Sequence, residues 1–309
     1  MTKAAFPSRP LAQLRGASKR YGATLALDAI DLSIHPGEVL ALLGVNGAGK
    51  STALGLLTGR LSADAGDVEL FGADPREAAV RRGIGVMLQD GRLPDTLRVI
   101  EQVRLQSSYY PRPRPIDETL ALAGVTDLAQ RRYGELSGGQ QRRVQFALAI
   151  CGAPPLLFVD EPTVGLDVEA RRGFWQVLRQ LRAAGTAIVL TTHYLEEADA
   201  LAERIVLLAG DRVRAEGSPA GIKARAAGKR VLARTRLSQA QLAAWPEVAR
   251  LQLDGERVEV HSGQVEALLR RWLAADPALD ELEVRPLSLE DAFLTLTEQS
   301  TEATLEKVA

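Results

Sequence analysis

The feature that most constrains this chain is a glycine-rich loop between a buried strand and a helix. Residues 41–52 read ALLGVNGAGKST, which places Gly44, Gly49, Lys50 and Ser51 in the pattern G-x-x-x-x-G-K-[ST]. Glycine leaves the backbone bare, so it is used where the chain must approach another group closely. Successive N–H groups of such a loop can curl around a phosphate chain, at a helix end whose dipole favours anions. The loop therefore predicts a site for a nucleoside triphosphate.

Each polar residue of this loop has a predicted role. Lys50 reaches the outer phosphates, and the Ser51 hydroxyl binds Mg²⁺. The predicted cradle also includes four neighbouring residues of the same loop, Asn46, Gly47, Ala48 and Thr52. The alternative is a glycine-rich turn that carries a lysine by coincidence, which leaves the flanking strand and helix unexplained.

An acidic pair at the end of an apolar run narrows the chemistry. In LLFVDEP, residues 156–162, Asp160 ends the run and Glu161 follows it directly. Asp160 can hold Mg²⁺ through water at this position. A carboxylate at the mouth of the site can orient or deprotonate an attacking water, so Glu161 is the candidate general base. The competing interpretation is an acidic strand end without a catalytic role.

A third stretch, LSGGQQRR at residues 136–143, opens a helix with Ser137, Gly138 and Gly139. The N-terminus of a helix that begins in this way can bind an anion. One chain needs only one cradle for the outermost phosphate. A second cradle, far along the sequence from the first, is expected to serve the nucleotide of another subunit.

Together these motifs make the chain resemble the nucleotide-binding subunit of an ATP-binding cassette (ABC) transporter, for which LSGGQ (Leu136–Gln140) is the signature. The resemblance covers roughly residues 11–220. It implies an ATPase that uses ATP and Mg²⁺. It also implies an α/β P-loop NTPase fold, with a mixed β-sheet core and a helical subdomain at about residues 95–152.

The resemblance assigns roles to four further residues. Tyr21, in SKRYG, is similar to the aromatic residue that stacks on adenine, although it could also be a plain tyrosine at a strand end. Gln89, in VMLQD, matches the glutamine that senses Mg²⁺ and the attacking water. Asp167, in VGLD, matches the loop that crosses the dimer interface, and His193, in LTTHYLEEAD, matches the histidine that contacts the γ-phosphate.

The pattern along the chain predicts the order of the elements. Short strands are expected between residues 11 and 70, followed by a region rich in helix formers at 96–152. PPLLFVDEP and GTAIVLTTH are continuous apolar runs, which is typical of parallel strands buried on both faces. The helix expected at 168–184 joins these two runs, so a strand–helix–strand unit and a parallel sheet follow.

The composition changes after residue 220, which predicts a domain at 1–220 and a small α+β domain at 221–309. An Ala/Gly/Lys/Arg segment at 220–229 is expected to be a linker. The strands and helices beyond it follow the order βαββαβ, the ferredoxin-like plan. A last helix opens with SLED, where Ser288 and Asp291 can form a reciprocal cap.

Composition excludes several classes of protein. The 309 residues carry a formal net charge of −1, so no global basic field points to nucleic acid. Cys151 is the single cysteine, which excludes an intrachain disulfide and fits a core residue in a reducing compartment. The first ten residues lack a signal-peptide core, and the longest apolar runs have strand length. The chain is therefore not expected to span a membrane by itself.

The resemblance also implies partners and a location. Integral-membrane permease subunits are expected, with a homodimer that forms composite ATP sites at the cytoplasmic face of the cell membrane. The tail LSLEDAFLTLTEQ resembles the end of exporter ATPases of the drug-resistance and antibiotic-resistance type. Export of a drug-like, amphipathic or lipid-like compound is the resulting expectation.

Two alternatives stay open at this stage: an importer subunit, and a non-transport ABC ATPase that acts on nucleic acid or the ribosome. One phosphate loop, one cysteine and the lack of sustained heptads argue against the second. Arginine pairs such as Arg142-Arg143 are interpreted as solvated helix faces. His35 and His261 have no partner motif and are interpreted as surface residues.

Overall fold

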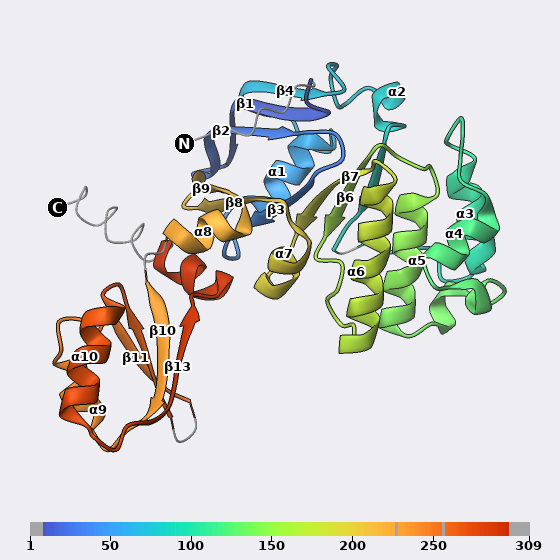
Figure 1. Cartoon of the computed structure of the whole chain (residues 1–309). Coiled ribbons are helices and arrows are strands. Elements are labelled where there is room, and N and C mark those ends of the chain that lie inside the picture. The colour runs from blue at the N-terminus through green and yellow to red at the C-terminus, as the bar shows by residue number, and fades with distance from the viewer. Residues whose placement is uncertain (1–8, 90, 226–227, 255–256, 297–309) are drawn as a thin grey trace. The chain divides into compact units, whose positions relative to one another are not determined.

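The chain separates into two units, Met1–Ser218 with two sheets and Pro219–Ala309 with one (Figure 1). The structure, a computed structural model, describes residues 9–89, 91–225, 228–254 and 257–296. The division falls close to the position where the composition of the sequence changes.

The first unit is built on a six-stranded mixed sheet with the order β5-β6-β7-β3-β8-β9. Its strands are β3 (Val39–Leu43), β5 (Ile84–Met87), β6 (Leu156–Asp160), β7 (Ala187–Thr191), β8 (Arg204–Ala209) and β9 (Arg212–Gly217). Neighbours from β5 to β8 pair in parallel, and β9 pairs antiparallel with β8. Every residue of β3, β6 and β7 is buried, which explains their continuous apolar runs.

A second sheet covers one face of the first. Its strands are β1 (Ala12–Tyr21), β2 (Thr24–Ile34) and β4 (Ala65–Leu70), which pair antiparallel in the order β2-β1-β4. Helix α1 (Lys50–Leu57) packs between the sheets, so that Leu27 of β2, Leu54 of α1 and Phe158 of β6 share one core. This core fixes the position of the glycine-rich loop.

Helices cover the other face. They are α3 (Val99–Ser107), α4 (Ile116–Leu122), η1 (Thr126–Leu128), η2 (Tyr133–Glu135), α5 (Gly138–Ile150), α6 (Val168–Ala183) and α7 (Leu195–Leu201). The short helix α2 (Ala78–Arg81) lies on the side of the second sheet, where Val80 packs against the core shared with α1. Figure 1 shows α3, α4 and α5 grouped together at the β5 end of the sheet. The rings of Phe146 on α5 and Phe174 on α6 lie 4.6 Å apart between centroids. Cys151, at the end of α5, is a buried core residue, as expected.

The second unit has the predicted βαββαβ order. Its elements are α8 (Pro219–Arg225), β10 (Lys229–Arg234), α9 (Gln239–Ala243), β11 (Arg250–Asp254), β12 (Arg257–Ser262), α10 (Val265–Ala275) and β13 (Asp280–Pro286). The strands form an antiparallel sheet in the order β11-β12-β10-β13, which is the split βαβ arrangement. Val231, Val260, Leu268 and Trp272 form the centre of its core.

The expected linker at 220–229 is wrong over most of its length, because Pro219–Arg225 form α8. Proline suits the first turn of a helix, and alanine, lysine and arginine are good helix formers. Ile222 is buried, so the helix also has a packing partner. Residues 226–227 of that segment lie outside the described residues.

The predicted cap of the last helix is confirmed. The Asp291 N–H donates to Ser288 Oγ at 3.1 Å, and the Ser288 N–H donates to Asp291 Oδ2 at 2.7 Å. Residues 289–296 are helical after this cap. The end of the expected exporter-type tail, residues 297–299, lies outside the described residues.

Candidate active site

The glycine-rich loop connects β3 to α1, and two of its glycines admit no side chain. Gly49 precedes α1 with φ 95°, in the left-handed region that favours glycine. A Cβ added there would lie 2.5 Å from the Leu27 side chain, and one at Gly44 would lie 2.6 Å from the Leu208 carbonyl oxygen. The loop can therefore keep this course only with bare backbone, whose N–H groups suit an anion.

The Lys50 side chain folds back onto the backbone of this loop. Its Nζ donates to the carbonyl oxygens of Gly44 at 2.6 Å and Val45 at 3.2 Å, and the residue is 8% exposed. Burial lowers the pKa of Lys50, while the charges of Glu161 and Asp160 act in the opposite direction. The ammonium group, the two carboxylates and the loop backbone thus meet at one place.

A cavity of about 180 Å³ lies at this place, and the residues that line it were all predicted from the sequence: Asn46, Gly47, Gly49, Lys50, Ser51, Thr52, Gln89, Asp160 and Glu161. They come from the loops after β3 and β5 and from the end of β6. The carboxyl ends of parallel strands meet at one edge of a sheet, where ligands of open α/β folds bind. The other two predicted loop residues, Gly44 and Ala48, do not belong to the described lining of the cavity. Both are buried within the loop and determine its course.

The acidic pair is held by the neighbouring strand β7. Thr191 Oγ1 donates to Asp160 Oδ1, and the Glu161 N–H donates to the Thr191 carbonyl at 3.0 Å. Both acidic residues are buried. Glu161 has φ 51°, a left-handed conformation that is costly for a residue other than glycine. Backbone strain of this kind clusters at active sites, which adds weight to the prediction for Glu161.

His193 and Glu161, predicted as separate parts of the site, are in direct contact. His193 Nδ1 is hydrogen-bonded to Glu161 Oε2. A carboxylate oxygen accepts hydrogen bonds, so this contact fits the tautomer of His193 that carries its proton on Nδ1. The imidazole ring also lies against Tyr194, with 4.1 Å between the ring centroids. The carboxylate is thus oriented by a partner from the loop after β7.

The signature residues lie away from this cavity. Ser137 caps α5: the Gln140 N–H donates to Ser137 Oγ at 3.4 Å, and the Ser137 N–H donates to Gln140 Oε1 at 3.0 Å. A Cβ at Gly138 would meet nothing within 4 Å, whereas one at Gly139 would lie 3.4 Å from the Leu166 side chain. The helix end is open, and the described lining of the cavity includes none of Ser137–Gln140.

Tyr21 and Asp167 are also outside the described lining of the cavity. Tyr21 ends β1 and is 48% exposed, with Lys19 Nζ 5.9 Å from its ring centroid. Asp167 is exposed and caps α6, where its Oδ1 accepts from the Ala170 N–H at 2.8 Å. The structure therefore brings both phosphate motifs, Gln89 and His193 together, and leaves Tyr21, Asp167 and the signature residues outside the cavity.

Comparison with known proteins identifies the family. The family model described as "ABC transporter" matches residues 27–164. The chain is 37% identical over 299 residues to "Nod factor export ATP-binding protein I" of Rhizobium sp. (strain N33), covering 94% of this chain and 98% of that protein. This chain belongs to the ATP-binding proteins of ABC transporters. The "Daunorubicin/doxorubicin resistance ATP-binding protein DrrA" of Streptomyces peucetius is also 37% identical, over 98% of this ABC protein and 99% of its own length.

Solved structures agree with this family. The "ATP binding subunit of ABC transporter" matches with a TM-score of 0.65 and 26% identity, over 70% of this chain and 92% of that one. A bacterial ABC transporter cassette, solved as a dimer, matches with a TM-score of 0.62 and 29% identity, over 67% and 98%. The first unit therefore has the ABC cassette fold of an ATPase family. Among the described residues, no helix has the length and apolar character needed to cross a membrane.

Sequence reasoning missed one positioning residue of this ABC cassette. Arg142, interpreted as part of a solvated helix face, is 8% exposed. Its guanidinium donates to the carbonyl oxygens of Leu88 at 2.9 Å, Gln89 at 2.8 Å and Asp160 at 2.8 Å, and also to that of Glu161. One side chain thus ties the helix that begins at the signature to the backbone of both cavity loops.

We expect Arg142→Met to lower ATP hydrolysis by about tenfold or more, because small misplacements of reacting groups cost orders of magnitude in rate. The methionine fills the space of the stem but leaves several buried carbonyl oxygens without a donor, at a cost of about 1–3 kcal/mol each in the free energy of unfolding. Arg143→Met is the matched control, since Arg143 donates only to the Gly124 carbonyl at an exposed site. Steady-state ATPase rates and melting temperatures check the prediction, and equal rates in both variants would contradict it.

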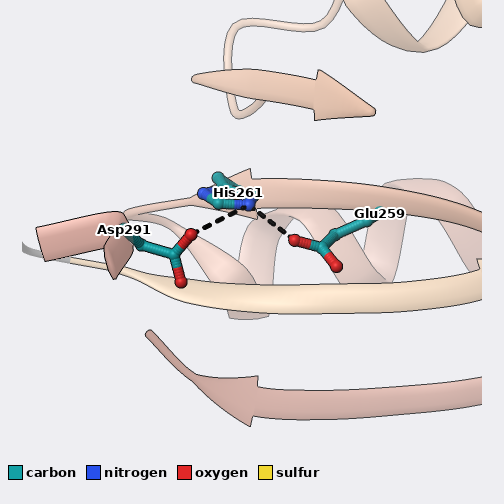
Figure 2. Close-up of side chains that lie close together, drawn as sticks. All are labelled: Glu259, His261 and Asp291. Atoms are coloured by element: carbon teal, nitrogen blue, oxygen red, sulfur yellow. Dashed lines mark hydrogen bonds and ion pairs between the residues drawn. The ribbon is translucent and has the colours of Figure 1, made fainter. Parts of the chain in front are cut away.

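The second unit holds a further charged cluster, which corrects the interpretation of His261 as a surface residue (Figure 2). His261 Nε2 lies 2.8 Å from Glu259 Oε1 and 3.9 Å from Asp291 Oδ1. This set resembles a metal centre. Arg230, however, lies 3.4 Å from Glu259 and 3.5 Å from Asp291 and already supplies the positive charge. We therefore interpret the cluster as an ionic clamp between β12 and the last helix.

Proposed function

We propose that this chain is the ATPase subunit of a membrane exporter for a drug-like, amphipathic or lipid-like compound. Two copies work with separate integral-membrane permease subunits at the cytoplasmic face of the cell membrane. One observation carries the proposal. The chain resembles proteins named for Nod factor export and for daunorubicin resistance over nearly its whole length, its second unit included.

The residues around the cavity account for ATP hydrolysis. Loop N–H groups and Lys50 bind the phosphate chain, and Glu161 takes a proton from the attacking water. His193 orients that carboxylate and, on closure, contacts the γ-phosphate. Tyr21, at the end of β1, stacks on the adenine, a contact worth about 1–3 kcal/mol.

The oxygen atoms of Ser51, Asp160 and Gln89 suit Mg²⁺, which prefers hydroxyl, carboxylate and carbonyl ligands. All three residues line the cavity, and Thr191 holds one oxygen of Asp160. When bound, the metal ion neutralises charge on the phosphates. The chain's own part is to hold these ligands on the rigid ends of β5, β6 and α1.

The open N-terminus of α5 supports a dimer with composite sites. Ser137 and Gly138 of one copy would close over the γ-phosphate bound to the partner copy, with Asp167 at the interface. Helix N-termini favour anions through their free N–H groups and dipole. ATP then favours the closed pair, and hydrolysis removes the bridging phosphate and reopens it.

A groove beside the Gln89 loop supports docking of a permease. Its volume is about 370 Å³, and its lining includes Leu88 and Gly91 of the loop, Tyr110 and, from α5, Leu148. Such a mostly apolar groove suits a short amphipathic helix from a membrane subunit. An occupant there would contact the loop that holds Gln89, so its movement would be coupled to the nucleotide.

The test is capture of the partner by tagged full-length protein carrying Glu161→Gln, from detergent-solubilised host membranes, with and without ATP–Mg²⁺. We expect an ATP-dependent complex with a polytopic membrane protein, and loss of that complex when Leu148→Arg is added. Leu105→Arg is the control, because Leu105 is exposed on α3 and is not part of the groove lining.

Recovery of ribosomal or nucleic-acid components in place of a membrane protein would overturn the transport proposal. The same complex, rebuilt with Glu161 in place so that it can hydrolyse ATP and reconstituted in proteoliposomes, then tests direction. With ATP added outside, only outward-facing ATPase subunits are active, so an exporter accumulates a fluorescent amphipathic dye inside the vesicles. ATP-driven release of preloaded dye would indicate an importer.

A further inference from the structure

A fully buried carboxylate that has no assigned role lies behind the histidine loop, residues 192–194. Glu197 on α7 is 0% exposed, and its Oε1 accepts a hydrogen bond from Trp175 Nε1 of α6 at 2.9 Å. Charged side chains are almost never fully buried unless they are paired. Among the described residues, a charge that acts on it is that of Arg171, near the start of α6. This burial calls for a functional explanation.

Three polar atoms in this region are buried without a hydrogen-bond partner among the described residues: Glu197 Oε2, Thr163 Oγ1 and Arg171 Nε. They are an acceptor and two donors. The hydroxyls of Thr192 and Thr163 lie close enough to counter the effect of burial, which raises the pKa of Glu197. The Thr163 hydroxyl is thus close enough to Glu197 to act on it, but no hydrogen bond of normal distance and angle to Oε2 is formed among the described residues, which is unusual because buried polar groups are normally satisfied.

The two hydroxyl groups that act on Glu197 come from two different loops of the first unit. Thr163 lies two residues after Glu161 and begins the interface loop, residues 163–167, which ends at Asp167. The Leu166 N–H donates to the Thr163 carbonyl at 3.1 Å, so Thr163 moves with this loop. On the other side, the Tyr194 N–H donates to Thr192 Oγ1 at 2.9 Å within the histidine loop.

The aromatic contacts connect the same loops a second time. The Arg171 guanidinium lies over the Tyr194 ring at 4.2 Å from its centroid, and that ring contacts His193 at an interplanar angle of 38°. Arg171 is anchored on α6, which begins where the interface loop ends. Glu197 therefore lies buried where groups from α6, α7, the interface loop and the histidine loop approach each other.

We propose that Glu197 is a positioning residue that couples the histidine loop to the interface loop. When two copies close over ATP, a small shift of the interface loop brings Thr163 Oγ1 to donate to Glu197 Oε2, and Trp175 holds the other oxygen. The bond then holds the histidine loop, whose His193 already contacts Glu161, in a fixed position relative to the interface loop. The proposal rests on ATP hydrolysis at the proposed site and needs no transport partner.

A double-mutant cycle in the full-length protein tests this coupling. Glu197→Gln keeps the shape of the side chain and the oxygen that accepts from Trp175. Thr163→Val keeps the branched shape of the side chain and removes the hydroxyl. We expect each single variant to lower kcat by about tenfold, with the Kd for ATP changed less than about twofold, because geometry and not binding is lost. The double variant should be no slower than the slower single variant. Glu196→Gln, an exposed neighbour on α7, should match the parent.

Multiplied losses in the double variant, or parent-like rates in both single variants, would overturn the proposal. The free energy of unfolding distinguishes a variant that is slow because it folds poorly from one that is slow because Glu197 no longer positions the loops. Since the pKa of Glu197 is raised on folding, its contribution to stability is present at low pH and is lost as the pH rises through the raised value. Glu197→Gln avoids that loss, so we expect it to unfold at pH 8 no more easily than the parent.

If the chain hydrolyses ATP too slowly without its membrane partner for rates to be compared, a fluorescence measurement tests the same contact. Trp175 is the only tryptophan in residues 1–218, and its indole N–H is bonded to Glu197. A non-hydrolysable ATP analogue should change Trp175 emission in the parent, with Trp175→Phe protein supplying the background. The change should be absent in Thr163→Val. An unaltered change in that variant, with analogue binding intact, would show that Thr163 does not reach Glu197.

Discussion

Glu161→Gln should lower kcat for ATP hydrolysis by about 10²–10⁴-fold, because the loss of a positioned general base removes that much catalysis. Glutamine has nearly the same shape, so the backbone hydrogen bonds of Glu161 to Thr191 should be kept. Lys50 and the phosphate loop are unchanged, and the Kd for ATP should remain within about threefold of the parent value. Single-turnover hydrolysis and equilibrium ATP binding are the measurements.

The same variant should trap the closed pair. Without hydrolysis the γ-phosphate stays between the copies, so ATP–Mg²⁺ should convert a monomeric variant to dimers in size-exclusion chromatography. Glu266→Gln is a suitable control, because Glu266 is an exposed acid of α10 in the second unit. Hydrolysis at the parent rate would remove Glu161 from the role of base and would point to another group for the water proton.

Those parts of the fold that depend on local patterns could be predicted from the sequence. Strands β6 and β7 are buried on both faces, so they appear as short apolar runs, and the helix between them makes them parallel. Helix caps such as those at Ser137 and Ser288 can be predicted from the sequence, because the residue that pairs with each serine lies only three positions further along the chain. The cavity was predictable because each of its three segments carries its own motif.

The residues that were missed depend on contacts between distant segments. Arg142 donates to carbonyl groups up to 54 residues away, and nothing in QQRRVQ separates it from the more exposed Arg143. His261 meets Asp291, which lies on the far side of α10 and β13 in the sequence. Glu197 is one acid among several in LEEAD, and only burial by α6 distinguishes it from Glu196. Periodicity cannot assign partners of this kind.

Mixing two inactive variants should restore part of the activity, and this is the sharpest test of composite sites. Lys50→Ala removes the cation that binds the outer phosphates, and Gly138→Asp places a negative charge where α5 is expected to meet the partner's γ-phosphate. Each variant alone should hydrolyse ATP at least about 10²-fold more slowly than the parent, since both sites of its dimer carry the lesion.

In a mixed dimer the two lesions fall on the same composite site. The phosphate loop of the Lys50→Ala copy faces the altered helix of its partner, and the other site has both parts intact. If copies assort at random and the sites act independently, an equimolar mixture recovers about a quarter of the parent rate. If α5 instead served the nucleotide of its own chain, every site in the mixture would carry one lesion and no rate would return. The control is Gly138→Asp protein alone at the same total concentration as the mixture. It shows whether a higher concentration by itself raises the rate, so any further recovery comes from dimers of unlike copies.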